Sequence, residues 1–274
     1  MSAELSLDHL TIAVLVKYVP DTQFDQTIDA EELTVNREES VMSELDEYAV
    51  EAALQITEKH QGEHKVVAFA MGPASASKGL RRALQLGADE GVLLSDEALA
   101  GSDAAATARA LAAGVKHWQK TNAATFDMVL TGMASTDGET SLVPAQLAEL
   151  LELPLLTNVA SLELSEQEVS ARRDLDDISQ ELHAPVPFIA SVTDQINTPR
   201  YPNFKAIMAA KKKPIITFTL DDLDLDPSTI GRAGSWVLVE DAKERAERTA
   251  GEIITDDGDA GVQLADFLAS RNLI

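Results

Sequence analysis

The first half of the chain alternates between short continuous apolar runs and longer segments whose apolar residues recur at helical spacing. The apolar runs at 11–16, 65–70, 91–94 and 126–131 predict strands that are buried on both faces. Helices are predicted at 47–56, 75–86, 104–119 and 142–151, with Asp46 as the N-cap of the first and Asp103 as the N-cap of the third. Strands that alternate with helices of this length indicate parallel β-α-β units, so we expect a three-layer, Rossmann-like α/β fold with a mainly parallel sheet.

The pattern changes after residue 155. Looser, strand-like alternation at 157–164 and 168–174 surrounds a polar turn at 165–167, and an apolar strand is predicted at 186–192. We interpret these segments as an antiparallel extension of the sheet. From residue 227 the chain is rich in Gly, Asp and Glu, with one short strand predicted at 236–240 and one helix at 261–270.

These patterns predict two regions, a nucleotide-binding α/β domain over residues 1–226 and a C-terminal arm over residues 227–274. The composition of the arm fits two interpretations equally well. It is either laid over a partner or a flexible C-terminus.

The composition excludes several kinds of site and partner. The chain has no cysteine, which excludes disulfides, iron–sulfur ligation, thiolate nucleophiles and cysteine-bound zinc. His60 and His64 are four residues apart but lie in a polar stretch with a glycine between them, so we expect no metal site. The net charge of −24 argues against a nucleic-acid partner. No apolar run approaches the roughly 20 residues that cross a bilayer. We therefore expect a cytoplasmic bacterial protein that does not span a membrane.

Three predicted strands end in segments that are suited to a ligand site. Val16 and Lys17 follow the first strand, Met71 and Gly72 the second, and Gly132 the fourth. In open α/β sheets, ligands bind in the crevice beyond the carboxyl ends of the strands.

The loop at 133–141, MASTDGETS, leads from the fourth strand into a predicted helix. Its hydroxyl groups and backbone N–H groups at a helix N-terminus suit a phosphate. Asp137 and Glu139 would repel a phosphate, so we assign Asp137 to ordering the turn or to binding a ribose hydroxyl. The loop lacks both GxGxxG and GxxxxGK[ST]. These residues alone fit a ligand site and a plain turn with a helix cap equally well.

The segment RYPNFKAIMAAKKKP at 200–214 has the character of a docking element. A Pro-Asn turn presents Phe204 directly before a helical run at 206–210, and three consecutive lysines follow in an otherwise acidic chain. Such a segment presses one apolar anchor into an acidic partner while its charge steers the encounter. The alternative is a surface turn with a solvated, lysine-rich helix end, in which Phe204 folds inward.

Several of these segments resemble the beta subunit of electron transfer flavoproteins. The segment at 200–214 is similar to that family's recognition loop, RYATLPNIMKAKKKP. The stretch at 126–154 is similar to its strand followed by GxQAIDxDxxQVGPxLAExLxxP, with matches at Gly132, Asp137, Pro144, 147–149 and Pro154. IAVLVKYVPDT, SELDEYAVEAALQI and FAMGPASASKGLRRALQLGADEGVLLSD also follow family motifs. The resemblance extends over roughly residues 11–223.

The resemblance implies an electron carrier rather than an enzyme. The family forms a heterodimer in which the alpha subunit holds most of the FAD. The beta subunit supplies one wall of that pocket, a structural AMP and a recognition loop at about 198–213. Electrons pass from acyl-CoA and related flavin dehydrogenases, as in fatty acid oxidation, to a downstream quinone oxidoreductase.

The same resemblance assigns residues to two sites. Residues assigned to cofactor binding are Leu15, Val16, Lys17, Ser43, Leu45, Asp46, Met71, Gly72, Gly132, Met133, Ala134, Ser135, Thr136, Asp137, Gly138, Glu139, Thr140, Ser141 and Val143. Residues assigned to partner docking are Arg200, Tyr201, Phe204, Ile207, Met208, Lys211, Lys212 and Lys213. Leu45 stands where the family has an aromatic residue near the flavin, and Phe204 stands where it has an exposed leucine.

Two alternatives remain open at this point. One is a bifurcating electron transfer flavoprotein whose beta subunit binds its own FAD and NAD. The other is a stand-alone adenine-nucleotide-binding protein on the same scaffold. No spacing of Ser, His and Asp singles out a nucleophile with its base.

Overall fold

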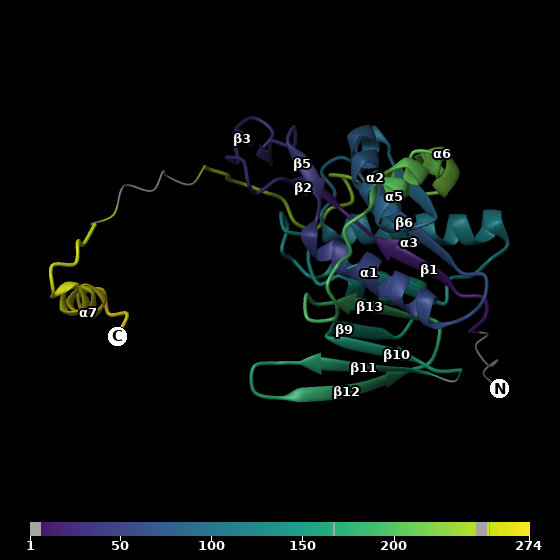
Figure 1. The fold of residues 1–274 in the computed structure, drawn as a ribbon. Coiled ribbons are helices and arrows are strands. Elements are labelled where there is room, and N and C mark those ends of the chain that lie inside the picture. Colours follow the sequence, from purple (N-terminus) through teal and green to yellow (C-terminus); the bar gives the residue numbers. More distant parts are fainter. Residues whose placement is uncertain (1–6, 167, 245–250, 252) are drawn as a thin grey trace. The chain divides into compact units, whose positions relative to one another are not determined.

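A seven-stranded parallel sheet forms the centre of the chain in this computed structural model, which describes residues 7–166, 168–244, 251 and 253–274. Its strands lie in the order β14-β7-β6-β1-β8-β13-β9 (Figure 1). They are β1 (Thr11–Leu15), β6 (Lys65–Met71), β7 (Glu90–Leu94), β8 (Met128–Gly132), β9 (Leu155–Val159), β13 (Phe188–Val192) and β14 (Ile215–Phe218). β7, β8 and β13 are buried along their whole length, as their largely apolar composition predicts, and the burial includes the polar side chains of Glu90, Thr131 and Ser191.

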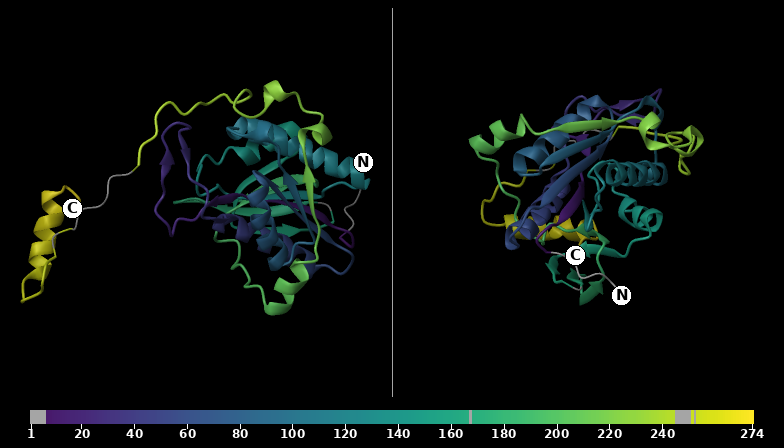
Figure 2. Two further views of the ribbon diagram at one scale, coloured as in Figure 1. Left: turned by 90° about the horizontal axis from the view of Figure 1, so that it is seen from above. Right: turned by 90° about the vertical axis from the view of Figure 1, so that its right-hand side faces the viewer.

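Helices cover both faces of this sheet (Figure 2). α1 (Glu44–Lys59) and α2 (Ser77–Leu86) pack with one core, whereas α3 (Ala104–Asn122) and α4 (Val143–Leu151) pack with a second core on the opposite face. Alternate residues of the strands feed the two cores, so that Ile12 of β1 contributes to the first and Ala13 to the second. The predicted three-layer α/β fold is confirmed.

Local signals explain several of the helix ends. Asp103 caps α3 by accepting a hydrogen bond from the backbone N–H of Ala106, as predicted. α2 ends at Gly87, as predicted, and follows the short turn η1 (Ala74–Ala76). The prediction that Asp46 is an N-cap is wrong, because α1 begins at Glu44 with Ser43 in the cap position. Asp46 instead lies inside the first turn, where its side chain is buried.

The antiparallel part of the molecule differs in detail from the prediction. The strand predicted at 186–192 is β13, which lies inside the central sheet and pairs parallel with both β8 and β9. A separate antiparallel sheet is formed by β10 (Ser161–Leu164), β11 (Val169–Asp174) and β12 (Ser179–Ala184), with β11 and β12 beside β9 (Figure 1). β12 was not predicted.

Two smaller antiparallel pairs lie before α1. One joins β2 (Tyr18–Pro20) to β5 (Ser40–Met42), and the other joins β3 (Ile28–Asp29) to β4 (Thr34–Val35). A short turn, η2 (Glu97–Leu99), lies between β7 and α3.

The segment after β13 contains α5 (Phe204–Ala210), α6 (Leu220–Leu223) and η3 (Pro227–Thr229). The first part of the predicted arm packs on the domain, since Ile230 is buried and Arg109 of α3 donates to Thr229 O at 2.6 Å. The compact unit extends to Ala242. Among its described residues, 236–240 form no strand, contrary to the prediction.

Residues 243–274 form a second unit, whose described part contains α7 (Ala260–Ser270) close to the predicted helix. The packing of this unit on a partner stays a prediction. Across the described parts of both units, no helix combines the length and apolarity that crossing a bilayer requires.

Candidate functional site

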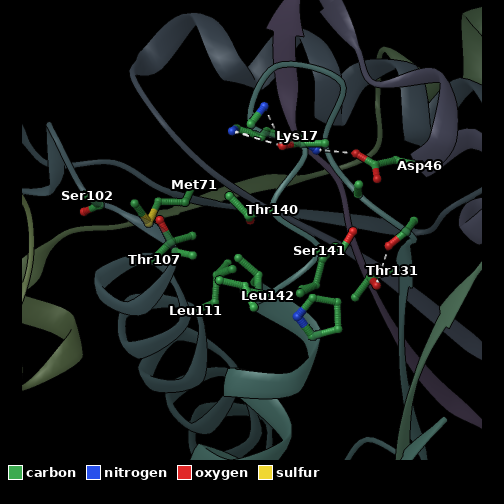
Figure 3. Close-up of a pocket in the computed structure, with 18 of the residues that line it drawn as sticks. Lys17, Asp46, Met71, Ser102, Thr107, Leu111, Thr131, Thr140, Ser141 and Leu142 are labelled. Carbon is green, nitrogen blue, oxygen red and sulfur yellow. Dashed lines mark hydrogen bonds between the residues drawn. The ribbon is translucent and has the colours of Figure 1, made fainter. Parts of the chain in front are cut away.

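The ends of three neighbouring strands meet at one edge of the sheet. β1 pairs parallel with β6 on one side and with β8 on the other, so that Leu15 lies opposite both Phe69 and Thr131. The predicted convergence of these strand ends is therefore confirmed. The loop after β8 and the N-terminus of α3 lie at the same edge (Figure 3).

A cavity of about 400 Å³ opens between these elements. Predicted cofactor-binding residues that line it are Leu15, Val16, Lys17, Asp46, Met71, Gly132, Met133, Ala134, Ser135, Gly138, Thr140, Ser141 and Val143. The volume lies within the range of small-molecule sites, about 300–1,000 Å³. Other predicted residues, namely Ser43, Leu45, Gly72, Thr136, Asp137 and Glu139, do not line the cavity.

The wall that α3 contributes was not predicted. Ser102 and Asp103 precede the helix, and Thr107 and Leu111 lie on its first turns. In Figure 3, Ser102 and Thr107 are seen to the left of Ser141. The signal for this wall was present in the sequence. Asp103 marks the start of a helix after a parallel strand, and such helices begin at the same edge where the strands end.

Arg37 was also missed. It comes from the loop between β4 and β5 and reaches the cavity mouth, where its guanidinium donates to the Asp137 carboxylate at 2.5 Å. No pattern in the sequence singles it out, because the contact joins residues that lie 100 positions apart.

The buried carboxylate of Asp46 marks the closest packing at this edge. Asp46 accepts a hydrogen bond from the backbone N–H of Lys17 at 2.7 Å. A Cβ atom at Gly132 would lie 2.6 Å from Asp46 Oδ1 and 2.9 Å from Leu45 O, so only glycine lets β8 approach α1 this closely. Burial raises the pKa of the Asp46 carboxyl to about 7, although the Lys17 N–H and charge oppose the shift.

Asp137 lies in the opposite electrostatic setting. Its carboxylate accepts from Lys17 Nζ at 2.8 Å and from Arg37, so two cations compensate its charge. Burial alone would raise its pKa, but the charge and hydrogen bonds of Lys17 and the hydrogen bond of Arg37 outweigh burial and lower the pKa to about 2. Asp137 therefore connects the loop at 133–141 to Lys17 and Arg37, and its assignment to ordering the turn or to binding a ribose hydroxyl stays a prediction.

The same loop contains two residues with unusual backbone conformations. Glu139 and Ser141 adopt left-handed backbone conformations with φ of 47° and 54°. α4 begins immediately afterwards, with Leu142 in the cap position and no side chain capping its first turn. An uncapped helix N-terminus beside a cavity suits an anionic group, whereas Leu15, Phe69 and Leu111 give the interior an apolar lining.

The predicted docking residues divide into two groups. Tyr201 and Phe204 are 92% and 79% exposed, so the alternative in which Phe204 folds inward does not hold. Met208, Lys211 and Lys212 are also exposed, and Ile207 is half-buried.

Arg200 and Lys213 bind within the chain instead of facing outward. Arg200 pairs with Glu51 and Glu58 of α1, and Lys213 Nζ donates to the carbonyls of Gly87 and Ala88. Both side chains therefore have partners within the chain, and their assignment to partner docking stays a prediction.

Comparison with known proteins identifies the family. The model of the electron transfer flavoprotein domain matches residues 32–223. The chain belongs to the electron transfer flavoprotein family. It is 38% identical over 270 residues to the electron transfer flavoprotein subunit beta of Mycobacterium leprae, which covers 96% of this chain and 99% of that protein. It is 37% identical to the same subunit of Thermoanaerobacterium thermosaccharolyticum, over 97% of this chain and the whole relative.

A further relative of this electron transfer flavoprotein chain carries a different name. It is the caffeyl-CoA reductase-Etf complex subunit CarD of Acetobacterium woodii, 34% identical over 96% of this chain and 97% of that protein. Membership of the beta-subunit family and a role in electron transfer, both expected from the motifs, are confirmed. Within the described residues, no cluster of His, Cys, Asp and Glu side chains is arranged to hold a metal ion.

Proposed function

We propose that this chain pairs with an electron transfer flavoprotein alpha subunit, supplies one wall of that subunit's FAD pocket and holds a structural AMP in its own cavity. The single observation that supports this most is the cavity at the carboxyl edge of the sheet. It lies beside the loop that carries Gly132 and Asp137, two of the matches to the family's AMP-binding motif.

The residues around the cavity fit a mononucleotide. The uncapped start of α4 and the backbone of 140–142 suit the phosphate. Leu15, Phe69 and Leu111 offer apolar surface to a purine. Asp137 is neutralised by Lys17 and Arg37, so its charge does not oppose a phosphate as an isolated carboxylate would.

The first turn of α1 is the proposed wall toward the flavin of the alpha subunit. Leu45 is half-buried there and does not line the AMP cavity, which leaves it available for a contact outside the chain. Ser43 is fully buried, so we assign it a supporting role under this turn. When FAD is bound, the flavin supplies the redox chemistry, and the protein supplies its position and electrostatic surroundings.

The recognition loop is the proposed contact with electron-donating flavin dehydrogenases, such as acyl-CoA dehydrogenases. Phe204 offers a large exposed anchor, and Lys211 and Lys212 stand exposed beside the end of α5 in a chain of net charge −24. An apolar anchor with positive neighbours fits a pocket with an acidic rim. A quinone oxidoreductase is the proposed acceptor.

Co-expression with the alpha subunit of the same organism tests this function. We expect a one-to-one heterodimer with one flavin, which an acyl-CoA dehydrogenase and its substrate reduce and a quinone oxidoreductase reoxidises. Failure to form a flavin-containing heterodimer, or a heterodimer that no acyl-CoA dehydrogenase reduces, would contradict the proposal.

The relationship to CarD supports a second candidate, a subunit that works in a complex with a CoA-ester reductase and binds its own FAD and NAD. This candidate requires two flavins per heterodimer. The flavin-to-protein ratio of the purified heterodimer therefore separates the two candidates.

A further inference from the structure

Two arginines hold the recognition loop at its two ends. At the start of the loop, Arg200 donates from Nε to Glu51 Oε2 at 2.7 Å and from Nη1 to Glu58 Oε1 at 2.6 Å. Its second Nη group reaches both carboxylates, at 3.1 Å and 3.0 Å. Glu51 is 5% exposed, so its two hydrogen bonds with the Arg200 guanidinium hold the arginine to a buried carboxylate, whereas the Glu58 carboxylate is exposed.

A second set of contacts joins the far end of the loop to α2. Arg81 of α2 donates through Nη1 to the carbonyls of Ala210 and Lys213, the latter at 3.0 Å. In return, Lys213 Nζ donates to the carbonyls of Gly87 and Ala88 at 2.9 Å and 2.6 Å, where α2 ends. Arg81 of α2 thus donates to carbonyl groups at the end of α5, and Lys213 donates to carbonyl groups at the end of α2.

Between these two anchors, the side chains of Tyr201, Phe204 and Met208 are exposed, whereas Ile207 is half-buried. α5 has only seven residues, a length at which a helix is marginal without outside support. Asn203 caps its start by accepting from the Ala206 N–H at 2.9 Å. Tyr201 and Phe204 have little contact with the rest of the chain, since 92% and 79% of their surfaces are exposed.

We propose that Arg81 and Arg200 are positioning residues, which hold α5 in one orientation so that Phe204 meets its partner without a prior ordering step. This inference rests on the proposed docking of flavin dehydrogenases at the recognition loop. An anchor on a pre-ordered helix binds more tightly than the same anchor on a mobile loop, because the ordering cost is already met in the free protein. Neither arginine is offered as a contact of the partner itself.

Arg81→Met in the assembled heterodimer is the test, with Arg82→Met as its matched control. Arg82 is the next residue of α2, and its Nε pairs with Glu47 of α1 at 2.7 Å. The measurement is the rate of flavin reduction against the concentration of an acyl-CoA dehydrogenase that reduces the wild-type heterodimer. Hydrogen exchange of the amides in the recognition loop is followed in parallel.

For Arg81→Met we expect a rise of about fivefold in the dehydrogenase concentration at half-maximal rate, with an unchanged maximal rate. We also expect faster exchange in α5, with flavin content and melting temperature within the range of Arg82→Met. Arg81→Lys retains a donor to the carbonyls and should restore part of the loss. Glu58→Gln weakens the other anchor while leaving the buried Glu51 paired, so it should shift the same quantity in the same direction by a smaller factor.

The outcomes separate this inference from the docking proposal. If Phe204→Ala leaves the dehydrogenase dependence unchanged, the proposed docking site is wrong and the positioning role falls with it. If Phe204→Ala weakens docking while Arg81→Met matches Arg82→Met in both kinetics and exchange, docking stands and the positioning role is refuted. A loss of maximal rate or of flavin in Arg81→Met would likewise refute it, because that result assigns Arg81 to general stability.

Discussion

The cavity and the recognition loop both contact α1. They differ in which groups surround the buried carboxylates of this helix. At the N-terminal turn, Asp46 is buried against backbone groups, and burial raises its pKa to about 7. Further along the same helix, the buried carboxylate of Glu51 faces the fork of an arginine. The first turn of α1 therefore supports the cavity through close backbone packing, and its later turns hold the exposed recognition loop through charge.

This difference indicates where each region is vulnerable. The cavity depends on shape, since α1 and β8 pack so closely at Gly132 that a Cβ atom at this position would collide with α1. The recognition loop depends on its anchors and on one or two exposed side chains. Steric changes should therefore damage the first region, and truncations of exposed groups should damage the second.

Gly132→Val should have the largest effect. The added side chain collides with Asp46 and Leu45, and we expect a loss of about 3 kcal/mol in the free energy of unfolding together with loss of bound nucleotide. Gly251→Val is the control, because a Cβ atom at that position meets no atom of the described residues within 4 Å. Urea unfolding of both variants measures the effect, and equal stability of the two would show that the α1–β8 contact is not close.

Phe204→Ala should have the next largest effect and should spare the cavity. We expect docking to a flavin dehydrogenase to weaken by about 2 kcal/mol, with unchanged heterodimer assembly and flavin content. Phe24→Ala, which truncates another exposed phenylalanine, is the control. Loss of assembly in Phe204→Ala would mean that this side chain belongs to the subunit interface.

Asp137→Asn should alter the pH dependence of stability. The lowered folded-state pKa of Asp137 means that its contribution is present above about pH 4 and disappears as the pH falls toward 2. We expect the variant to lose about 1–2 kcal/mol at neutral pH and to show a smaller decline in acid. Unfolding free energies measured from pH 2 to pH 8 give both quantities.

Asp46 should change the free energy of unfolding in the opposite direction as the pH rises, and over a different pH range. Its raised folded-state pKa means that the unfolded chain releases the proton first, so its contribution to stability falls as the pH rises from about 4 to about 7. This decline should persist in Asp137→Asn and flatten in Asp46→Asn. If the unfolding free energy of Asp46→Asn declines between pH 4 and pH 7 as steeply as that of the wild type, the group responsible for the decline is not Asp46.

Lys211→Glu should have the smallest effect. Lys211 is exposed at the end of α5, so its charge should steer association more than stabilise the complex. We expect association with the dehydrogenase to slow by severalfold at low salt and the difference to shrink as salt increases. A change confined to the dissociation rate would contradict a steering role.

The sequence predicted what depends on periodicity and missed what depends on distant contacts. Buried strands and amphipathic helices repeat at fixed spacing, so the order of elements and the meeting of β1, β6 and β8 were predictable. The position of β13 was not, because an apolar run does not say which neighbour it pairs with or in which direction. Aspartate is a common N-cap residue, but tertiary packing places Asp46 inside the first turn of α1.

The site was predictable to a similar degree. The family motifs identified the loop at 133–141, and most of its residues line the cavity. Arg37 was missed because it reaches the cavity from a loop with no motif of its own. The α3 wall was missed although Asp103 marks the start of a helix at the same edge. The basic residues of the recognition loop were interpreted as one charged surface, yet Arg200 and Lys213 have buried or backbone partners that only the folded chain provides.

The nucleotide bound in the cavity is the most direct test of the proposed function. The purified heterodimer is extracted with acid, and the released nucleotides are separated and counted against protein and flavin. We expect one AMP and one FAD per heterodimer, and we expect the AMP to be lost in Gly132→Val. Two FAD molecules and no AMP, or no adenine nucleotide beyond that of a single FAD, would contradict it.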